Sequence, residues 1–532
     1  MKNCFLKKSK ILCVLLVFFL FFCLTNQLSN ASETVYFFNG ALYSSLDGIN
    51  ITATDDVKIL EPSNSYYSRY TDKANGFSCL IPKGMITNVT LSPVVTRFYD
   101  DNTSIDIYID DFTNTNSDAY QYVNYSNNFL KNSKYHQTIS NYTEVVNGRS
   151  VHVLKWTRPL LSKVPNDKNY YASLEFIIDS NHAYTIIIKS KYAIDIERDI
   201  MNNFYTINRE GTPQFSKRVT KSITPLNEET KNFYNEYFSE DSKLVWGIFE
   251  MSAPLDFRKL EKIEGTIGYT FPFLVYYHTL DDLFPVRVLD KSAANNRYME
   301  ITFQTFHMEK DNQGLIYEIL NGKYDDYLRQ YAKSMSQEER PVLFRFNNEM
   351  NGDWCLYSAY YYSKDPELYR ALWKYLHGIF VEEGVKNVLW VFNPHDLSFP
   401  PFAWNHYLNY YPGDEYVDII GLTGYNTGNY FPGEKWREFS EIYPSLYHEY
   451  DKLFKQPFMI TEFGSNSVGG DKVAWINKMF VEMGQFDRIK VAIWWNGIDF
   501  DSQGRPGRIY RLDETPEIMN AFKEGFKKTQ NQ

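Results

Sequence analysis

The sequence predicts an α/β fold: a (β/α)8 TIM barrel preceded by a smaller α+β domain with an antiparallel sheet. From residue 244 onward, eight apolar runs of strand length alternate with amphipathic helical stretches, which is typical of a parallel barrel. Before residue 205, alternating strand patterns separated by turn residues predominate. We therefore divide the 532 residues into a signal peptide at 1–31, an accessory domain at 32–205, a connector at 206–240 and a barrel at 241–532.

Residues 1–31 have the pattern of a secretory signal. Four lysines precede an unbroken apolar run of 14 residues from Ile11 to Leu24, which is short for a membrane span. The small residues that end at Ala31 predict cleavage after it, and therefore a secreted, extracellular protein. If the signal is not cleaved, the same segment anchors the chain to a membrane.

Composition excludes several classes of function. Removal of 1–31 takes four lysines and no acid, so 51 basic and 65 acidic side chains remain. This negative excess argues against nucleic acid and anionic membrane surfaces as partners. Only Cys79 and Cys355 remain, and the nine histidines show no zinc-type spacing, so we expect no disulfide framework, no metal and no cofactor. Aromatic residues make up 17% of the chain, which indicates aromatic-lined clefts or surfaces.

The accessory domain shows several short strands and two helical stretches. The predicted strands are 76–82, 104–110, 151–156, 172–179 and 182–190, and the predicted helices are 118–130 and 194–205. The segment from Gly76 to Pro82 and the strand order resemble PsbP-like domains. This resemblance carries no function across.

The barrel half shows eight strands, and two of them end in a glutamate. The predicted strands are Leu244–Met251, Phe271–His278, Met299–Phe306, Val342–Asn348, Val388–Asn393, Val417–Gly424, Phe458–Glu462 and Val491–Asn496. Barrel active sites lie at the carboxyl ends of the strands, where Glu349 and Glu462 stand in the fourth and seventh units. Retaining glycoside hydrolysis needs two such carboxyls, one nucleophilic and one protonated.

Longer motifs around these glutamates resemble one enzyme family. The motifs are Pro341–Trp354, Asn321–Tyr327, Trp390–Asn393, and Tyr410–Asp418 followed by Gly421 and Tyr425. Together they resemble glycoside hydrolase family 26, whose members include β-mannanases and some β-glucanases. The resemblance implies that Glu349 is the general acid/base and Glu462 the nucleophile. It further implies that Tyr425 hydrogen-bonds the nucleophile and that Trp354 stacks on a sugar.

Two positions depart from the family pattern. Asn348 stands where the family usually has His, and Thr423 stands where Asp is common. Asn is the commoner residue before the acid/base in related barrels, where it binds the sugar 2-hydroxyl. Both departures leave the carboxylates in place and bear on which sugar is bound.

Further residues near the strand ends are candidates for substrate binding. Arg345 is expected to help keep Glu462 ionised. In the Trp494–Trp495 pair, we expect one ring to form a sugar platform and the other to pack in the core. The full set of predicted substrate-binding residues is Asn348, Tyr425, Trp354, Arg345, Trp494, Trp495 and Asn393.

These observations predict a secreted retaining endo-β-glycanase that acts on β-1,4-linked mannan or glucan. Two alternatives remain open: a β-1,3-xylanase or mixed-linkage glucanase, and a non-catalytic polysaccharide-binding barrel. The expected partner is a polysaccharide or oligosaccharide substrate, with association to a cell surface or exopolysaccharide as a further option. We expect a monomer.

Overall fold

A computed structural model describes residues 33–115, 117–216 and 220–530, so the predicted signal at 1–31 lies outside the described residues. The chain forms two compact units. The first comprises residues up to 125, 133–160 and 165–218, and the second comprises 126–132, 161–164 and 219–532. Within the described ranges, no helix has the length and apolar character needed to cross a membrane.

The first unit is built from two antiparallel sheets, whose strand orders are β13-β5-β4-β3-β1-β2 and β6-β7-β8-β12-β11-β10-β9. The strands are β1 Val35–Phe38, β2 Ala41–Tyr43, β3 Val57–Pro62, β4 Tyr67–Asp72, β5 Phe77–Pro82, β6 Ile86–Asn88, β7 Thr96–Tyr99, β8 Thr103–Asp111, β9 Gln137–Val146, β10 Arg149–Thr157, β11 Tyr170–Ile177, β12 His182–Ser190 and β13 Tyr205–Thr206. Helices α2 (Ala119–Ser126) and α3 (Glu197–Asn202) accompany them. One apolar core, which includes Phe77 and Ile186, joins residues of both sheets.

The second unit is a closed barrel of eight parallel strands, which confirms the predicted fold class. The strands are β14 Val245–Phe249, β15 Phe273–Thr279, β16 Tyr298–Gln304, β17 Val342–Phe346, β18 Val388–Phe392, β19 Ile419–Asn426, β20 Phe458–Ser465 and β21 Ile489–Trp495. Strand β14 pairs with β21 to close the ring. A short hairpin of β22 (Ile498–Phe500) and β23 (Pro506–Ile509) follows.

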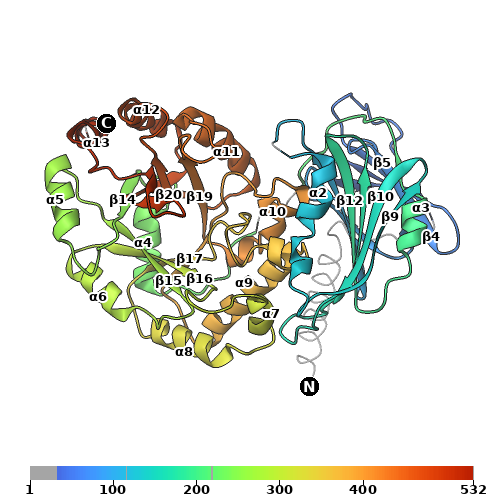
Figure 1. The fold of residues 1–532 in the computed structure, drawn as a ribbon, viewed down its shortest axis with the longest axis horizontal. Helices are drawn as coiled ribbons and strands as arrows, with labels where there is room; N and C mark the ends of the chain where they lie inside the picture. Colours follow the sequence, from blue (N-terminus) through green and yellow to red (C-terminus); the bar gives the residue numbers. More distant parts are fainter. Residues whose placement is uncertain (1–32, 116, 217–219, 531–532) are drawn as a thin grey trace, which may run out of the picture. The chain divides into compact units, whose positions relative to one another are not determined.

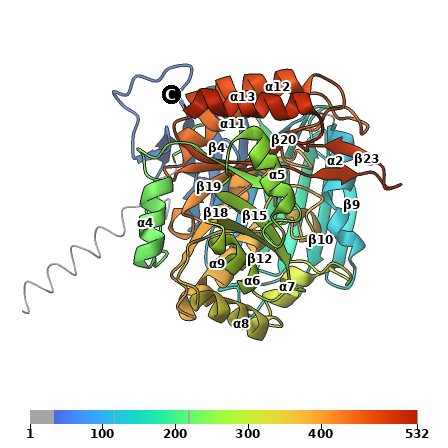
Figure 2. The same ribbon diagram turned by 90° about the vertical axis from the view of Figure 1, so that its left-hand side faces the viewer.

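Helices surround the barrel on its outer side (Figure 1). They are α5 Arg258–Ile267, α6 Val286–Ala294, α7 Leu315–Ile319, α8 Asp325–Ser336, α9 Pro366–Glu382, α10 Tyr407–Tyr410, α11 Phe439–Leu453, α12 Lys472–Glu482 and α13 Pro516–Gln530. Figure 2 shows α12 and α13 side by side. Local sequence sets several ends: Asp365 and Asp471 cap the first turns of α9 and α12, and Gly268 ends α5 in the left-handed conformation.

The segment treated as a connector contains a helix that packs against the barrel. Helix α4 (Glu228–Tyr237) places Phe233 against Phe273 and Tyr298, at the starts of β15 and β16. Phe233 belongs to one buried cluster with inward-facing residues of the barrel, such as Leu343 and Met459. The amino-terminal end of the barrel is therefore filled with apolar side chains, and polar chemistry is confined to the opposite end.

Candidate active site

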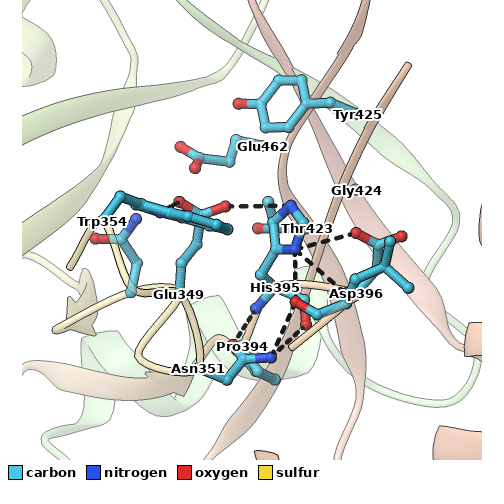
Figure 3. A network of polar contacts seen from close by, with 12 residues as sticks. Glu349, Asn351, Trp354, Pro394, His395, Asp396, Thr423, Gly424, Tyr425 and Glu462 are labelled. Carbon is cyan, nitrogen blue, oxygen red and sulfur yellow. Dashed lines mark hydrogen bonds and ion pairs between the residues drawn. The ribbon is translucent and has the colours of Figure 1, made fainter. Parts of the chain in front are cut away.

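The two glutamates singled out from the sequence lie at the carboxyl-terminal end of the barrel. Glu349 follows β17 in a tight turn, and Glu462 lies within β20. Asn347 and Glu349 both adopt positive φ angles, 47° and 53°, which are unfavourable for residues with a side chain. The Glu349 N–H donates to the Asn393 carbonyl at 2.7 Å, and this bond helps to hold the turn. Figure 3 shows the two carboxyl groups pointing into the same space.

Glu349 lies in surroundings that favour its protonated form. Burial and the negative charge of Glu462 raise the pKa of Glu349 to about 7, against smaller opposing effects of His395 and Arg345. Its Oε2 accepts a hydrogen bond from Trp354 Nε1 at 3.3 Å. A carboxyl with this pKa still holds a proton near neutral pH and is suited to act as a general acid.

Glu462 is held by two donors that come from other strands. Its Oε2 accepts a hydrogen bond from the Tyr277 hydroxyl and another from Arg345 Nη2, the latter at 3.1 Å. Both donors favour the carboxylate form, which a nucleophile needs. Trp495 Nε1 in turn donates to the Tyr277 oxygen at 3.1 Å, so the hydroxyl proton is directed to Glu462.

The prediction that Tyr425 hydrogen-bonds the nucleophile is wrong in this structure. Tyr425 lies beside Glu462 (Figure 3), and burial together with the Glu462 charge raises the pKa of its phenol well above 10. Among the described residues, however, its hydroxyl has no hydrogen-bond partner, and Tyr277 fills that role. Tyr425 remains a candidate for a substrate contact.

Arg345 and Asn393 are enclosed by protein, which corrects their prediction as substrate contacts. Arg345 is fully buried, and its Nε lies 2.6 Å from a carboxylate oxygen of Glu300. Its Nη1 donates to Asn393 Oδ1 at 3.1 Å, and the Asn393 amide also bonds to Thr423. Because their polar atoms are used within the barrel, both residues act on a substrate only through Glu462 and the Glu349 turn.

Asn348 is oriented by two neighbours at its carbonyl oxygen. Oδ1 accepts from Gln304 Nε2 at 2.9 Å and from the Tyr357 hydroxyl at 3.2 Å. The Tyr357 hydroxyl also lies 2.6 Å from the Asn348 backbone carbonyl. With Oδ1 occupied, Nδ2 is the amide atom that remains to donate to a sugar hydroxyl.

The predicted tryptophans occupy different surroundings. Trp354 is 47% exposed beside Glu349, and its ring meets His395 edge-on at 5.1 Å. Trp495 is partly exposed and stacks on Phe249 at 5.4 Å. Both rings are accessible enough to pack on a sugar face.

Trp494 is not a sugar platform. It is fully buried, packs against Phe463 and Phe522, and donates from Nε1 to the Tyr510 carbonyl at 2.8 Å. Successive side chains of a strand point to opposite faces, so Trp494 faces the outer helices while Trp495 faces the barrel mouth. Trp494 is therefore the core member of the pair, and sugar binding by Trp495 stays a prediction.

A cavity of about 520 Å³ adjoins this group of residues. Tyr277 and Gln304, which hold Glu462 and Asn348, form part of its wall. Thr279, Asp282 and Phe306 from the ends of β15 and β16 line it further. Neither Glu349 nor Glu462 is part of its wall, so the cavity lies beside the residues that hold the site and not at the two carboxyl groups themselves.

Sequence reasoning missed Tyr277 and Glu300. Each lies in or just beyond a predicted strand, and a polar side chain among apolar residues near a strand end was the available signal. Which partner each would meet depends on closure of the barrel, which no local pattern encodes.

Comparison with known proteins gives the family of the barrel. Residues 293–450 match the model of Glycosyl hydrolase family 26. Endoglucanase H of Acetivibrio thermocellus is 30% identical over 213 residues, which are 39% of this chain and 23% of that protein. A mannan endo-1,4-beta-mannosidase of Bacillus subtilis is 28% identical over 212 residues, which are 38% of this chain and 51% of that protein. The chain thus spans about a quarter and a half of these two relatives.

Comparison with solved structures also finds partial matches to the chain. The catalytic domain of the endo-beta-1,4-mannanase from Bacillus sp. JAMB-750 aligns at 17% identity with a TM-score of 0.44, covering 58% of this chain and 93% of that one. The family match and the two curated relatives confirm the resemblance seen in the sequence motifs. Residues 293–450 of the barrel therefore match glycosyl hydrolase family 26, the family that the sequence motifs resemble.

Proposed function

We propose that this chain is a secreted retaining endo-β-glycanase that hydrolyses β-1,4-linked mannan or glucan. The observation that carries the proposal is the unlike setting of two carboxyls at one barrel mouth. Glu462 accepts hydrogen bonds from Arg345 and Tyr277, whereas burial opposite that charge keeps a proton on Glu349. Unequal carboxyls of this kind supply the nucleophile and the acid of double displacement.

The reaction follows in two steps. Glu462 attacks the anomeric carbon while Glu349 gives its proton to the departing glycosidic oxygen, which leaves a covalent glycosyl-enzyme. Glu349, now a carboxylate, then takes a proton from a water molecule that attacks the same carbon and releases Glu462. Asn348 Nδ2 donates to the sugar 2-hydroxyl, and Trp354 packs against a sugar face.

The candidate substrates follow from the activities for which two relatives are named. One is named an endoglucanase and the other a mannan endo-1,4-beta-mannosidase, so both β-1,4 glucan and mannan are candidates. Reducing-sugar release from purified mannan, cellulose derivatives, mixed-linkage glucan and β-1,3-xylan distinguishes them and the two enzymatic alternatives. A non-catalytic barrel is less well supported because both carboxyls are present, and absence of release from every polymer would favour it.

Substitution of each glutamate tests the two roles. Glu462→Ala should lower kcat by about 10³-fold or more, because it removes the covalent route. Azide should restore activity toward an activated aryl glycoside in both Glu462→Ala and Glu349→Ala. NMR of the glycosyl azide should show inverted configuration for Glu462→Ala and retained configuration for Glu349→Ala. The opposite pairing would exchange the roles, and near-normal activity of Glu462→Ala would exclude it as nucleophile.

The proton on Glu349 predicts a pH limit. Its pKa of about 7 means that the acid form is lost as pH rises through neutrality, so kcat/KM for an oligosaccharide should fall above about pH 7. Initial rates measured between about pH 5 and pH 9 locate this limb. In Glu349→Ala, assayed with a dinitrophenyl glycoside that departs without protonation, the limb should be absent. Its persistence there would assign the titration to another group.

The structure also predicts which of two tyrosine substitutions lowers activity more. Tyr277→Phe removes a hydrogen bond to the Glu462 carboxylate and should lower kcat/KM about 10- to 100-fold. Tyr425→Phe is the matched control, because the same atom is removed beside the same carboxylate without loss of such a bond, and its effect should be smaller. Steady-state measurement of kcat/KM for both variants on the same oligosaccharide tests this order. A larger loss for Tyr425→Phe would contradict the arrangement.

A further inference from the structure

His395, in the loop after β18, faces the oxygen of Glu349 that accepts no hydrogen bond from any residue in the described ranges. Its Nε2 lies 3.9 Å from Glu349 Oε1, while Oε2 accepts from Trp354 (Figure 3). A gap of 3.9 Å exceeds a direct hydrogen bond and closes with a small side-chain shift or one bridging water. Contacts of catalytic acids are often this long before substrate binds.

The imidazole ring is fixed on its other side. Nδ1 lies 2.9 Å from the Leu397 carbonyl oxygen and 3.3 Å from Asp396 Oδ1, and both of these oxygens are hydrogen-bond acceptors. The Leu397 N–H lies farther from Nδ1, at 3.2 Å. The two acceptors therefore favour the proton on Nδ1, which leaves Nε2 of a neutral ring as an acceptor toward Glu349.

The partners of this ring are themselves anchored. Asp396 Oδ2 is paired with Arg437 Nη1 at 2.6 Å, and the His395 N–H donates to Asn351 Oδ1 at 2.9 Å. Arg437 also donates to the Tyr425 carbonyl at 2.9 Å. The loop thus presents Nε2 in one position relative to Glu349.

The two oxygens of Glu349 consequently meet opposite groups. Oε2 faces an N–H donor, Trp354 Nε1, and Oε1 faces the acceptor Nε2 of His395. The other charged groups that act on Glu349 are Glu462 and Arg345. An acid proton is favoured on the oxygen that faces the acceptor, because the other oxygen already accepts a hydrogen bond.

We propose that His395 is a positioning residue for Glu349: its Nε2 faces Oε1 and orients the carboxyl group for delivery of the acid proton to the leaving group. The proposal rests on the proposed function of Glu349 as general acid. His395 touches the reaction only through Glu349, so its contribution should matter where departure of the leaving group needs a proton. A role limited to bracing the loop through Nδ1 would affect all substrates alike.

Two substitutions of His395 distinguish the role of Nε2 from the role of Nδ1. The amide nitrogen of His395→Asn replaces Nδ1 and keeps the loop bond to Leu397, but nothing replaces Nε2. His395→Gln places its amide near Nε2 and loses the Nδ1 donor. His448→Gln, at an exposed site on α11, is the control for loss of a histidine elsewhere.

The measured quantity is kcat/KM for two substrates with different leaving groups. In a retaining enzyme, kcat/KM reports only the first step, which is formation of the glycosyl-enzyme. One is mannohexaose or cellohexaose, whichever the wild type cleaves, and the other is the matching 2,4-dinitrophenyl β-bioside. We expect His395→Asn to lose about 10- to 100-fold on the hexaose, a part of what general acid catalysis contributes, and less than about threefold on the activated bioside. His395→Gln should show the same preference with a smaller loss, and His448→Gln should match the wild type on both.

Equal losses on both substrates in either histidine variant, or no loss on the hexaose, would overturn the inference and leave Glu349 as the acid. If His395→Asn does not fold, the ratio of the two losses in His395→Gln decides alone. A wild-type chain that is inactive on both hexaoses and on both matching activated biosides would instead overturn the proposed function, and this inference with it.

Discussion

The hydrogen bonds that Arg345 and Tyr277 donate to Glu462 set the character of the whole site. Arg345 is fully buried and also bound to Glu300, so the guanidinium cannot turn away from Glu462. Burial, together with the negative charge of Glu462 across the barrel mouth, raises the pKa of Glu349 to about 7. The two glutamates thus lie in unlike surroundings, although the two residues are chemically identical.

The barrel supplies these contacts because its strands present side chains inward in layers. At the amino-terminal end the inner layer is apolar, with Leu343 and Met459 in one cluster that α4 completes. At the carboxyl-terminal end the inner layer is polar. Gly421 shows how closely the wall packs there, since a Cβ at this position would lie 2.7 Å from Thr461 Cγ2 and 2.8 Å from Asn393 Cβ. Only glycine leaves room at this point of the wall beneath the site.

Much of the fold was predictable because it follows from short-range pattern. The eight apolar runs coincide with the eight barrel strands within a few residues, and both glutamates stand at strand ends. Helices α5 and α6 stand between predicted strands, where the alternating pattern predicts helices, although no bounds were predicted for them. In the first unit, β1 to β4, β6, β7 and β9 were not anticipated either, since several are short or largely exposed.

The partners within the site could not be derived in the same way. Tyr277 meets Glu462 although 185 positions separate them in the chain, so their contact depends on closure of the ring. The choice between Trp494 and Trp495 depends on which of these two adjacent residues faces inward. An error of one residue in the strand register exchanges the two faces, and strand boundaries read from sequence are not accurate to one residue. Family resemblance predicted which two carboxyls react, and only the structure shows the residues that hold them.

The proposed role of Glu462 as the nucleophile can be tested directly by trapping the covalent intermediate. The chain is incubated with 2-deoxy-2-fluoro glycosyl fluorides of the manno and gluco series, and the labelled peptide is identified by mass spectrometry. We expect one fluoroglycosyl group per chain, attached to the peptide that contains Glu462, because the substituent slows release of the covalent intermediate. A label on a different residue, or product of inverted configuration from a chain that is never labelled, would contradict the account.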